Sequence, residues 1–226
     1  SIDEMLFAIG HYPTANATEK FLLYVEQMEE LFPGILKDQP YIVNKEIKKL
    51  SPKKKASFML YLKTLDIKET MVHYKDKKIN WTTILSDDYP EQLKHIFIPP
   101  VVLFYQGDIH LLERQTLLAV VGSRDYTEYG TQVVNKILTD LILKSNHEIA
   151  IVSGLAKGID TEANVTTIRQ LGRTIGVIGT GLDVYYPSKN KQLQELMSNS
   201  HLVISEYPVG AKPLKYRFPE RNRLIA

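Results

Sequence analysis

The sequence contains no cysteine. This absence excludes disulfide scaffolds, thiolate zinc sites, iron–sulfur clusters and cysteine nucleophiles, and it is compatible with a reducing cytoplasm. Long hydrophobic runs are also missing: the stretch Leu117–Val121 is far shorter than the roughly 20 residues that cross a bilayer. Residues 1–10 carry two acids where a signal peptide would carry bases. We therefore expect a cytoplasmic protein without a membrane partner.

Several motifs of nucleotide-dependent enzymes and hydrolases are absent as well. Gly179-Thr180-Gly181 begins like a dinucleotide fingerprint, but Val184 stands where the third glycine belongs, and no P-loop pattern occurs. Ser123 and Ser153 lack the Gly-x-Ser-x-Gly sequence of a hydrolase elbow. The six histidines are too widely separated to form a local metal pair. We expect no cofactor, no metal site and no catalytic residue.

The charge of the whole chain gives no sign of nucleic acid, because 28 basic and 26 acidic side chains among 226 residues leave a net charge of +2. The arginines, however, all lie after residue 113. Arginine is preferred where phosphate or carboxylate is recognised by two oxygens at once. Within Tyr207–Ala226 five cations accompany the single acid Glu220, and three aromatic residues lie between them. The cations are Lys212, Lys215, Arg217, Arg221 and Arg223, and the aromatic residues are Tyr207, Tyr216 and Phe218.

Cations spaced by aromatic rings suit single-stranded nucleic acid, since the cations meet phosphates while the rings stack on unpaired bases. In the alternative interpretation, Phe218-Pro219 fills a small core and the charges are solvated. Both interpretations are open from the sequence alone.

The N-terminal part of the chain is predicted to be helical. Apolar residues recur at helical spacing over Asn16–Phe32, Ser51-Pro52 is a helix-start signal, and a third short helix is expected over Val43–Leu50. Residues 1–72 are therefore predicted to form a small all-helical domain. Its lysines are explained as well by a solvated helix face as by nucleic-acid contact. A role of this domain as a protein-interaction module is a further possibility.

Beyond residue 73 apolar strands alternate with helix-length stretches. Continuous apolar strands separated by helices predict a parallel sheet with helices on its faces. The strands are expected at Leu117–Val121, Ile149–Val152, Thr174–Ile178 and Leu202–Ile204. Residues 73–226 are thus predicted to be an α/β domain with a doubly wound, mostly parallel sheet.

Glycine-rich turns follow three of these strands, at Gly122-Ser123, Ser153-Gly154 and Gly179–Gly181. Ligands of such sheets bind beyond the carboxyl ends of the strands, where backbone amides and helix N-termini attract anions. Each glycine alone is explained by a tight turn. Three such turns at one edge favour an anion site.

Carboxylates lie near the same loops, at Asp160, Asp183 and Glu206. They could act as acid or base, or they could orient neighbouring cations and cap helices. A rival hypothesis is therefore a nucleotide-binding hydrolase or a phosphoribosyl-transfer enzyme that uses the same loops, with Glu206 or Asp183 as acid/base.

Five motifs in order resemble the DNA-processing protein A family, also called DprA or Smf. They are Gly122-Ser123-Arg124 with Tyr129-Gly130, then Ser153 to Asp160, then Gly179 to Asp183 with Tyr186-Pro187 and Asn190, then Ser205 to Pro208, and Phe218-Pro219-x-Arg221-Asn222-Arg223. Asn164 departs from the histidine usual in the family.

The resemblance implies an extended Rossmann fold behind a sterile-alpha-motif-like or helix-hairpin-like domain. It also implies a non-enzymatic protein that binds single-stranded DNA, protects incoming DNA in natural transformation and helps to load the RecA recombinase. The full-length protein is expected to be a homodimer. Because the family pattern continues past Ala226, we expect the α/β domain to be incomplete at its C-terminus.

The expected interface lies at the carboxyl edge of the sheet. Arg124, Lys189, Lys215, Arg221 and Arg223 are the candidate phosphate contacts, and Phe218 or Tyr216 is the candidate stacking ring. The DNA-binding set as a whole is Gly122, Ser123, Arg124, Gly154, Lys157, Gly158, Gly179, Gly181, Lys189, Asn190, Lys215, Phe218, Arg221, Asn222 and Arg223, supported by Asp160, Asp183 and Glu206.

Overall fold

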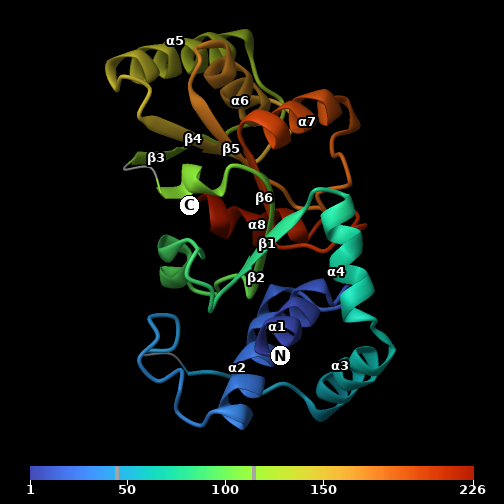
Figure 1. Cartoon of the computed structure of the whole chain (residues 1–226). Coiled ribbons are helices and arrows are strands. Elements are labelled where there is room, and N and C mark those ends of the chain that lie inside the picture. The colour runs from blue at the N-terminus through green and yellow to red at the C-terminus, as the bar shows by residue number, and fades with distance from the viewer. Residues whose placement is uncertain (44–45, 114–115) are drawn as a thin grey trace. The chain divides into compact units, whose positions relative to one another are not determined.

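The computed structural model describes residues 1–43, 46–113 and 116–226 (Figure 1). The chain divides into two compact units. The first unit comprises Ser1–Phe104 and Glu206–Val209, and the second comprises Tyr105–Ser205 and Gly210–Ala226. This division does not test the predicted domain boundary near residue 72, which stays a prediction.

Four helices form most of the first unit: α1 (Ile2–His11), α2 (Ala17–Leu31), α3 (Pro52–Thr64) and α4 (Ile67–Asp76). Each begins after a side chain that accepts a hydrogen bond from the third helical N–H, which satisfies one of the unpaired donors of the first turn. These capping residues are Ser1, Asn16, Ser51 and Asp66. The predicted helices over Asn16–Phe32 and from Ser51-Pro52 are confirmed.

The short helix expected over Val43–Leu50 is not found in residues 46–50, which have no regular secondary structure, and residues 44–45 lie outside the described residues. The backbone N–H of Leu50 donates to the Glu26 carboxylate at 2.8 Å. Ser51 caps α3 immediately afterwards. Residues 46–50 therefore lead into α3, and the N–H of Leu50 is bonded to a side chain of α2 and not to a carbonyl of a helix of its own.

The core of the first unit is rich in aromatic rings. Phe7 lies within 5.2 Å of Tyr74, 4.8 Å of Trp81 and 6.2 Å of Phe104, measured between ring centroids. Such edge and tilted contacts are the favoured geometries of aromatic pairs. Trp81 belongs to β1 (Asn80–Thr83), which lies beside β2 (Val102–Gly107), so the rings join α1 and α4 to these strands.

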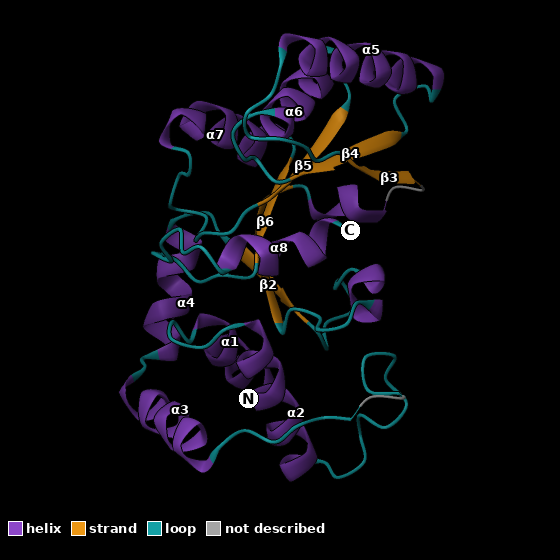
Figure 2. Ribbon diagram, turned by 180° about the vertical axis from the view of Figure 1, so that it is seen from behind, coloured by secondary structure: helices purple, strands orange, loops and turns teal. Residues whose placement is uncertain are grey.

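The second unit has four parallel strands: β3 (Thr116–Ala119), β4 (Ile149–Ser153), β5 (Arg173–Val177) and β6 (Leu202–Ser205). They lie in the order β6-β5-β4-β3, with the last residues of β2 next to β6 (Figure 2). The register places Thr116 opposite Ile149, Ile151 opposite Thr174, and Ile175 opposite Leu202. The predicted α/β class and the four predicted strands are confirmed.

The connections are α5 (Glu128–Lys144), α6 (Ile159–Arg169) and α7 (Lys191–Ser200). Because consecutive right-handed crossovers step in one direction along the sheet, all three helices lie on one face. The last helix, α8 (Arg217–Ile225), lies on the other side of these strands (Figures 1 and 2). The second unit therefore places α8 against the carboxyl ends of β4 and β5.

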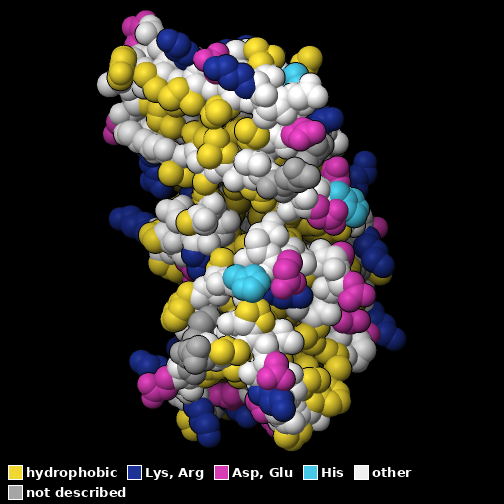
Figure 3. Space-filling model, turned by 90° about the vertical axis from the view of Figure 1, so that its left-hand side faces the viewer, with side chains coloured by type: hydrophobic (Ala, Val, Ile, Leu, Met, Phe, Trp, Pro, Cys, Tyr) yellow, Lys and Arg dark blue, Asp and Glu magenta, His cyan; other side chains and the backbone are white. Residues whose placement is uncertain are grey.

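Apolar packing fixes this arrangement. Leu138 and Ile142 of α5, Ile151 of β4 and Ala163 of α6 form a buried cluster. On the outside, hydrophobic side chains gather in the part of the second unit that contains α5 (Figure 3). Here Ile137 is 52% exposed.

Candidate nucleic-acid interface

A pocket of about 340 Å³ lies beyond the carboxyl ends of β4 and β5. This is the edge at which ligands of α/β sheets bind. It is lined by Arg124, Gly154, Ala156, Lys157, Ile178, Gly179, Thr180, Tyr185, Tyr186, Pro187, Ser188, Phe218 and Arg221. The lining residues come from three loops and from α8, which therefore meet around one cavity. Six of them are among the site residues predicted from the sequence.

Two aromatic rings form an apolar wall of the pocket. The centroids of Tyr186 and Phe218 are 5.4 Å apart, with an angle of 39° between the ring planes. Gly179 lies beneath Phe218: a Cβ on Gly179 would lie 3.2 Å from Phe218 Cδ1. Glycine at this position therefore allows the ring to approach the end of β5 closely. Tyr186 is 48% exposed, so its ring is accessible from solvent.

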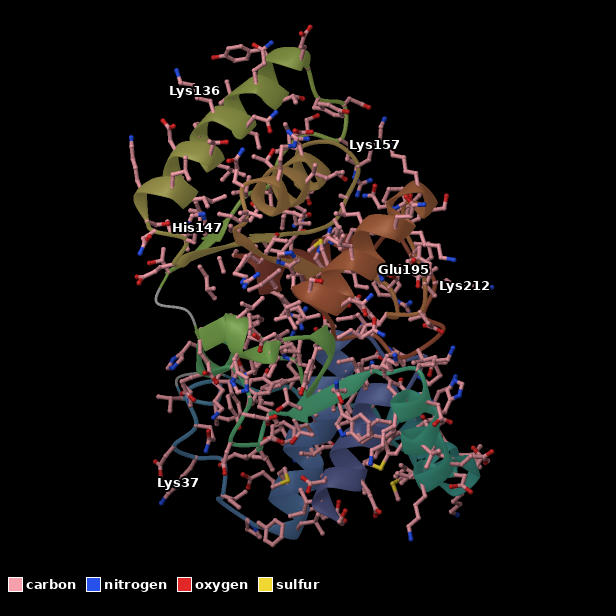
Figure 4. All side chains as sticks on the ribbon, turned by 45° about the horizontal axis from the view of Figure 1, so that its top comes forward. Lys37, Lys136, His147, Lys157, Glu195 and Lys212 are labelled. Atoms are coloured by element: carbon pink, nitrogen blue, oxygen red, sulfur yellow. The ribbon has the colours of Figure 1, made fainter. Side chains whose placement is uncertain are left out.

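Two exposed cations, Arg124 and Lys157, lie at the same pocket. The Arg124 guanidinium carbon is 5.4 Å from the centroid of the Phe218 ring. A guanidinium over a ring face gains a cation–π attraction while its N–H donors point outward in its own plane. Lys157 Nζ lies 3.2 Å from Asp125 Oδ1 in an exposed ion pair, and Lys157 projects from the loop before α6 (Figure 4). The pocket thus combines stacking surface with positive charge.

The glycine turns bring the first two loops into contact. Gly158 has φ = +94°, and a Cβ at this position would collide with the Ser123 carbonyl oxygen. The N–H of Ile159 donates to that same oxygen at 3.2 Å. Gly158 therefore serves the close packing of one loop on the other.

Several loop amides that were predicted to meet an external anion are engaged within the protein. The N–H groups of Gly122 and Gly154 donate to the Asp160 carboxylate, at 3.3 Å and 3.1 Å. The N–H of Gly181 donates to the Ala211 carbonyl at 3.0 Å. In the first two loops, the buried side chain of Asp160 thus occupies the place expected for an anionic ligand.

The environment of Asp160 perturbs its ionisation. Asp160 is 5% exposed, and this burial raises the pKa of its carboxyl group. The N–H of Gly122, the charge of Arg221 and the N–H of Gly154 lower the pKa and oppose the effect of burial. Asp160 therefore acts as a buried acceptor that organises two loops.

Arg221 is also buried, with 4% of its surface exposed. Its Nη1 donates to the carbonyls of Gly154 and Val177, at 2.8 Å and 2.6 Å, and its Nε donates to Asn222 Oδ1 at 3.0 Å. Although it lines the pocket, its guanidinium is directed to the ends of β4 and β5. Arg223, two residues later, donates from Nη1 to the Glu220 carbonyl at 2.7 Å and is more exposed.

The other predicted residues are divided between structural and exposed positions. Asn190 is buried, and its Nδ2 donates to the Leu155 carbonyl at 3.0 Å. Asp183 accepts a hydrogen bond from the N–H of Gly210 at 2.7 Å. Lys189 and Lys215 are exposed and are not among the pocket-lining residues.

Two further positions, Ser123 and Glu206, belong to the predicted set, and Asn164 is the departure from the family motif. Ser123 Oγ accepts from the N–H of Asp125 at 3.1 Å, which shapes the first loop. Glu206 is buried and belongs to the first unit. Asn164 lies in the interior of the second unit, where its Nδ2 donates to Thr174 Oγ1 at 2.8 Å.

Sequence reasoning missed the tyrosines of the third loop. Tyr185 and Tyr186 both line the pocket. The Tyr185 hydroxyl donates to Glu195 at 3.1 Å, and Lys191 Nζ lies 5.3 Å from the Tyr185 ring centroid. The signal was present in the Tyr186-Pro187 pair, which belonged to a family motif but was not assigned a role.

Within the described parts of the chain, no group of three or more His, Cys, Asp or Glu residues could hold a metal ion. Over the same residues, no helix is both long enough and apolar enough to span a membrane.

The chain is similar in sequence to proteins that process DNA. The family model described as DNA recombination-mediator protein A matches residues 80–226. DNA processing protein DprA of Streptococcus pneumoniae is 51% identical over 144 residues, which are 64% of this chain and 49% of that protein. DNA processing protein DprA of Bacillus subtilis is 44% identical over 153 residues, which are 68% of this chain and 50% of that protein. The chain spans about half the length of these curated relatives.

Solved structures give a similar result. The X-ray structure of DNA processing protein A from Streptococcus pneumoniae matches with a TM-score of 0.74 at 36% identity, over 98% of this chain and 73% of the other. A structure describing the single-stranded DNA binding mode of DNA processing protein A from Helicobacter pylori matches with a TM-score of 0.56 at 31% identity. It covers 65% of this chain and 64% of the other.

Proposed function

Because the chain belongs to the DNA recombination-mediator protein A family, we propose that it binds single-stranded DNA in the pocket formed by Arg124, Lys157, Tyr186 and Phe218. The observation that carries this proposal is the Phe218 ring, which lies beneath the Arg124 guanidinium and beside the Tyr186 ring. A stacking surface beside a cation is the arrangement that suits an unpaired base and its phosphate. The Helicobacter pylori relative, whose structure describes single-stranded DNA binding, supports the choice of ligand.

In this proposal one base stacks on the Tyr186–Phe218 wall, and the neighbouring phosphates contact cations. Arg124 is the phosphate contact at the pocket, and the exposed Lys189 and Lys215 and the half-buried Arg223 bind the strand on either side. Base stacking contributes about 1–3 kcal/mol per base. Since every base offers a π-face and phosphates carry no sequence information, we expect little sequence discrimination.

The wider role proposed for the protein is recombination mediation without catalysis. It would protect incoming single-stranded DNA and assist loading of the RecA recombinase during natural transformation, and the full-length protein would act as a homodimer. RecA filament formation on DNA coated with this protein, measured against uncoated DNA, tests this part. A slower rate on the coated DNA would contradict it.

We also propose that residues 1–72 and 73–226 are separate domains, supported by the start of the family match at residue 80. Limited proteolysis of the whole chain tests this boundary. Cleavage that concentrates near residues 70–80 supports it, and cleavage elsewhere contradicts it.

DNA binding itself is tested by titrating labelled oligo(dT) at several salt concentrations. Neutralisation of about four phosphates predicts a log–log salt slope of about −3 for single strands. The combined change Arg124→Ala and Lys215→Ala is expected to weaken binding and to reduce the slope by about 1.4. Lys136→Ala with Lys144→Ala on α5 is the matched control, because neither residue lines the pocket and the pair removes the same charge. Lys136 is labelled in Figure 4.

Two results would argue against binding in the pocket: DNA binding that is independent of salt, and an equal loss of affinity in the pocket variant and the α5 control. Turnover of a nucleoside monophosphate, or mononucleotide binding that displaces a long oligonucleotide, would instead favour a nucleotide-processing enzyme.

A further inference from the structure

Arg221 of α8 is surrounded by acceptors of the second unit. Its Nη1 is shared between the carbonyls of Gly154, just after β4, and Val177, at the end of β5. Its guanidinium carbon also lies 5.7 Å from the centroid of the Phe218 ring on the same helix. One buried side chain therefore connects the ends of two neighbouring strands to the helix that carries the stacking ring.

Asp160 completes this connection at the backbone of Gly154. A Cβ at Gly154 would lie 2.6 Å from Asp160 Oδ2 and 2.8 Å from Arg221 Nη1, so the glycine backbone is held between the two side chains. The N–H of Gly154 donates to Asp160, and its carbonyl accepts from Arg221. Asp160 also accepts from Gly122 of the first loop.

Both side chains are almost fully buried, at 5% for Asp160 and 4% for Arg221. A buried charge is tolerated when its hydrogen-bonding capacity is satisfied by the protein, and removal of one partner leaves the others uncompensated. A phosphate contact requires donors directed toward solvent. Nη1 of Arg221 donates to two backbone carbonyls instead, and Nε donates to Asn222 Oδ1.

We propose that Arg221 and Asp160 form a positioning pair, which holds the first two loops and α8 together and thereby sets the Phe218 ring for stacking. Arg221 then contributes to binding through Phe218 and not through a phosphate. This inference rests on the proposed function of the pocket, and it assigns to Arg221 a role other than the one predicted from the sequence.

The conservative change Arg221→Lys separates the two roles. Lysine keeps the charge, so a phosphate contact would be retained. A single ammonium cannot, however, bond the two carbonyls, donate to Asn222 as Nε does and place a planar group beside the Phe218 ring at the same time. Stacking is followed by fluorescence of a 2-aminopurine base in oligo(dT), which falls when the base stacks on a ring. For Arg221→Lys we expect loss of this quenching, affinity lower by about fivefold or more, and an unchanged salt slope.

Arg223→Gln is the matched control on the same helix. It is expected to reduce the salt slope by about 0.7 while quenching is retained. Gly154→Ala perturbs both members of the pair, because its methyl group meets both Asp160 and Arg221, and it should reproduce the loss of quenching expected for Arg221→Lys. Folding of each variant is checked by thermal melting.

Retained quenching and affinity in Arg221→Lys would overturn the inference. If that variant does not fold, NMR of the wild-type protein distinguishes the two roles by measuring how fast the Arg221 guanidinium hydrogens exchange with water. Slow exchange with water before DNA is added supports a positioning role, and protection that appears only with DNA contradicts it. A wild-type protein that does not bind oligo(dT) at all would instead contradict the proposed function.

Discussion

Replacement of Phe218 by leucine isolates the contribution of the ring. Leucine retains apolar volume above Gly179, where Phe218 Cδ1 lies 3.2 Å from the position of a Cβ, but it removes the π-face beside Tyr186 and Arg124. Stacking of one base contributes about 1–3 kcal/mol, which corresponds to about 5- to 150-fold in affinity. We expect a loss in this range for Phe218→Leu.

The assay is fluorescence anisotropy of labelled oligo(dT), repeated over a series of salt concentrations. Because no charge is removed, the salt slope should equal that of the wild-type protein. Tyr216→Leu is the control: Tyr216 is 49% exposed and does not line the pocket, so its replacement should change affinity less than twofold. An unchanged affinity for Phe218→Leu, or a larger loss for Tyr216→Leu, would refute the assignment of the stacking ring.

Three further predictions concern the two units. Arg124→Gln should reduce the salt slope of oligo(dT) binding by about 0.7, and an unchanged slope would show that Arg124 does not contact a phosphate. Burial lowers the pKa of His11 to about 4, and its Nδ1 lies 2.8 Å from the Tyr74 hydroxyl. The folded state therefore favours neutral His11, and stability that is fully present above pH 6.5 should fall by about 2 kcal/mol near pH 4.5. Urea unfolding at the two pH values should show a smaller fall for His11→Gln, and equal falls would contradict the prediction. Gly158→Ala should lower the free energy of unfolding by about 1–3 kcal/mol, because alanine is strained at φ = +94° and would collide with the Ser123 carbonyl; a urea midpoint equal to wild type would contradict this.

Much of the fold was predictable because hydrophobic periodicity and turn chemistry agree along the chain. The four apolar segments became β3 to β6 within two residues at each end, and Ser51-Pro52 marked the start of α3. The family resemblance based on the five motifs is confirmed by the match over residues 80–226. Two of the glycine turns, at Gly154 and Gly179, line the pocket at the carboxyl edge of the sheet.

The individual roles of the C-terminal cations were less predictable. The composition of Tyr207–Ala226 indicates a basic segment and does not by itself indicate α8. In a helix, residues four apart share a face, and Arg217 and Arg221 are accordingly both buried, at 5% and 4% exposure. The net charge of the segment therefore overstates the positive charge at the surface. The sequence alone does not distinguish a buried arginine from an exposed one.

The glycine amides gave a similar difficulty. A strand-to-helix turn rich in glycine suits both an external anion and a carboxylate of the protein itself. The sequence does not reveal which of the two the amides bind, because the answer depends on where the first turn of α6 places the Asp160 carboxylate. In the structure the carboxylate of Asp160 accepts the N–H groups of Gly122 and Gly154.

The central claim is that unpaired bases stack in the pocket of the second unit, and photocrosslinking tests it most directly. Oligo(dT) containing one 5-iododeoxyuridine is irradiated in complex with the wild-type protein, and the crosslinked peptide is identified by mass spectrometry. Crosslinks at Phe218 or Tyr186, lost upon competition with unlabelled oligo(dT), are the predicted result. Crosslinks confined to residues outside the pocket would contradict the account.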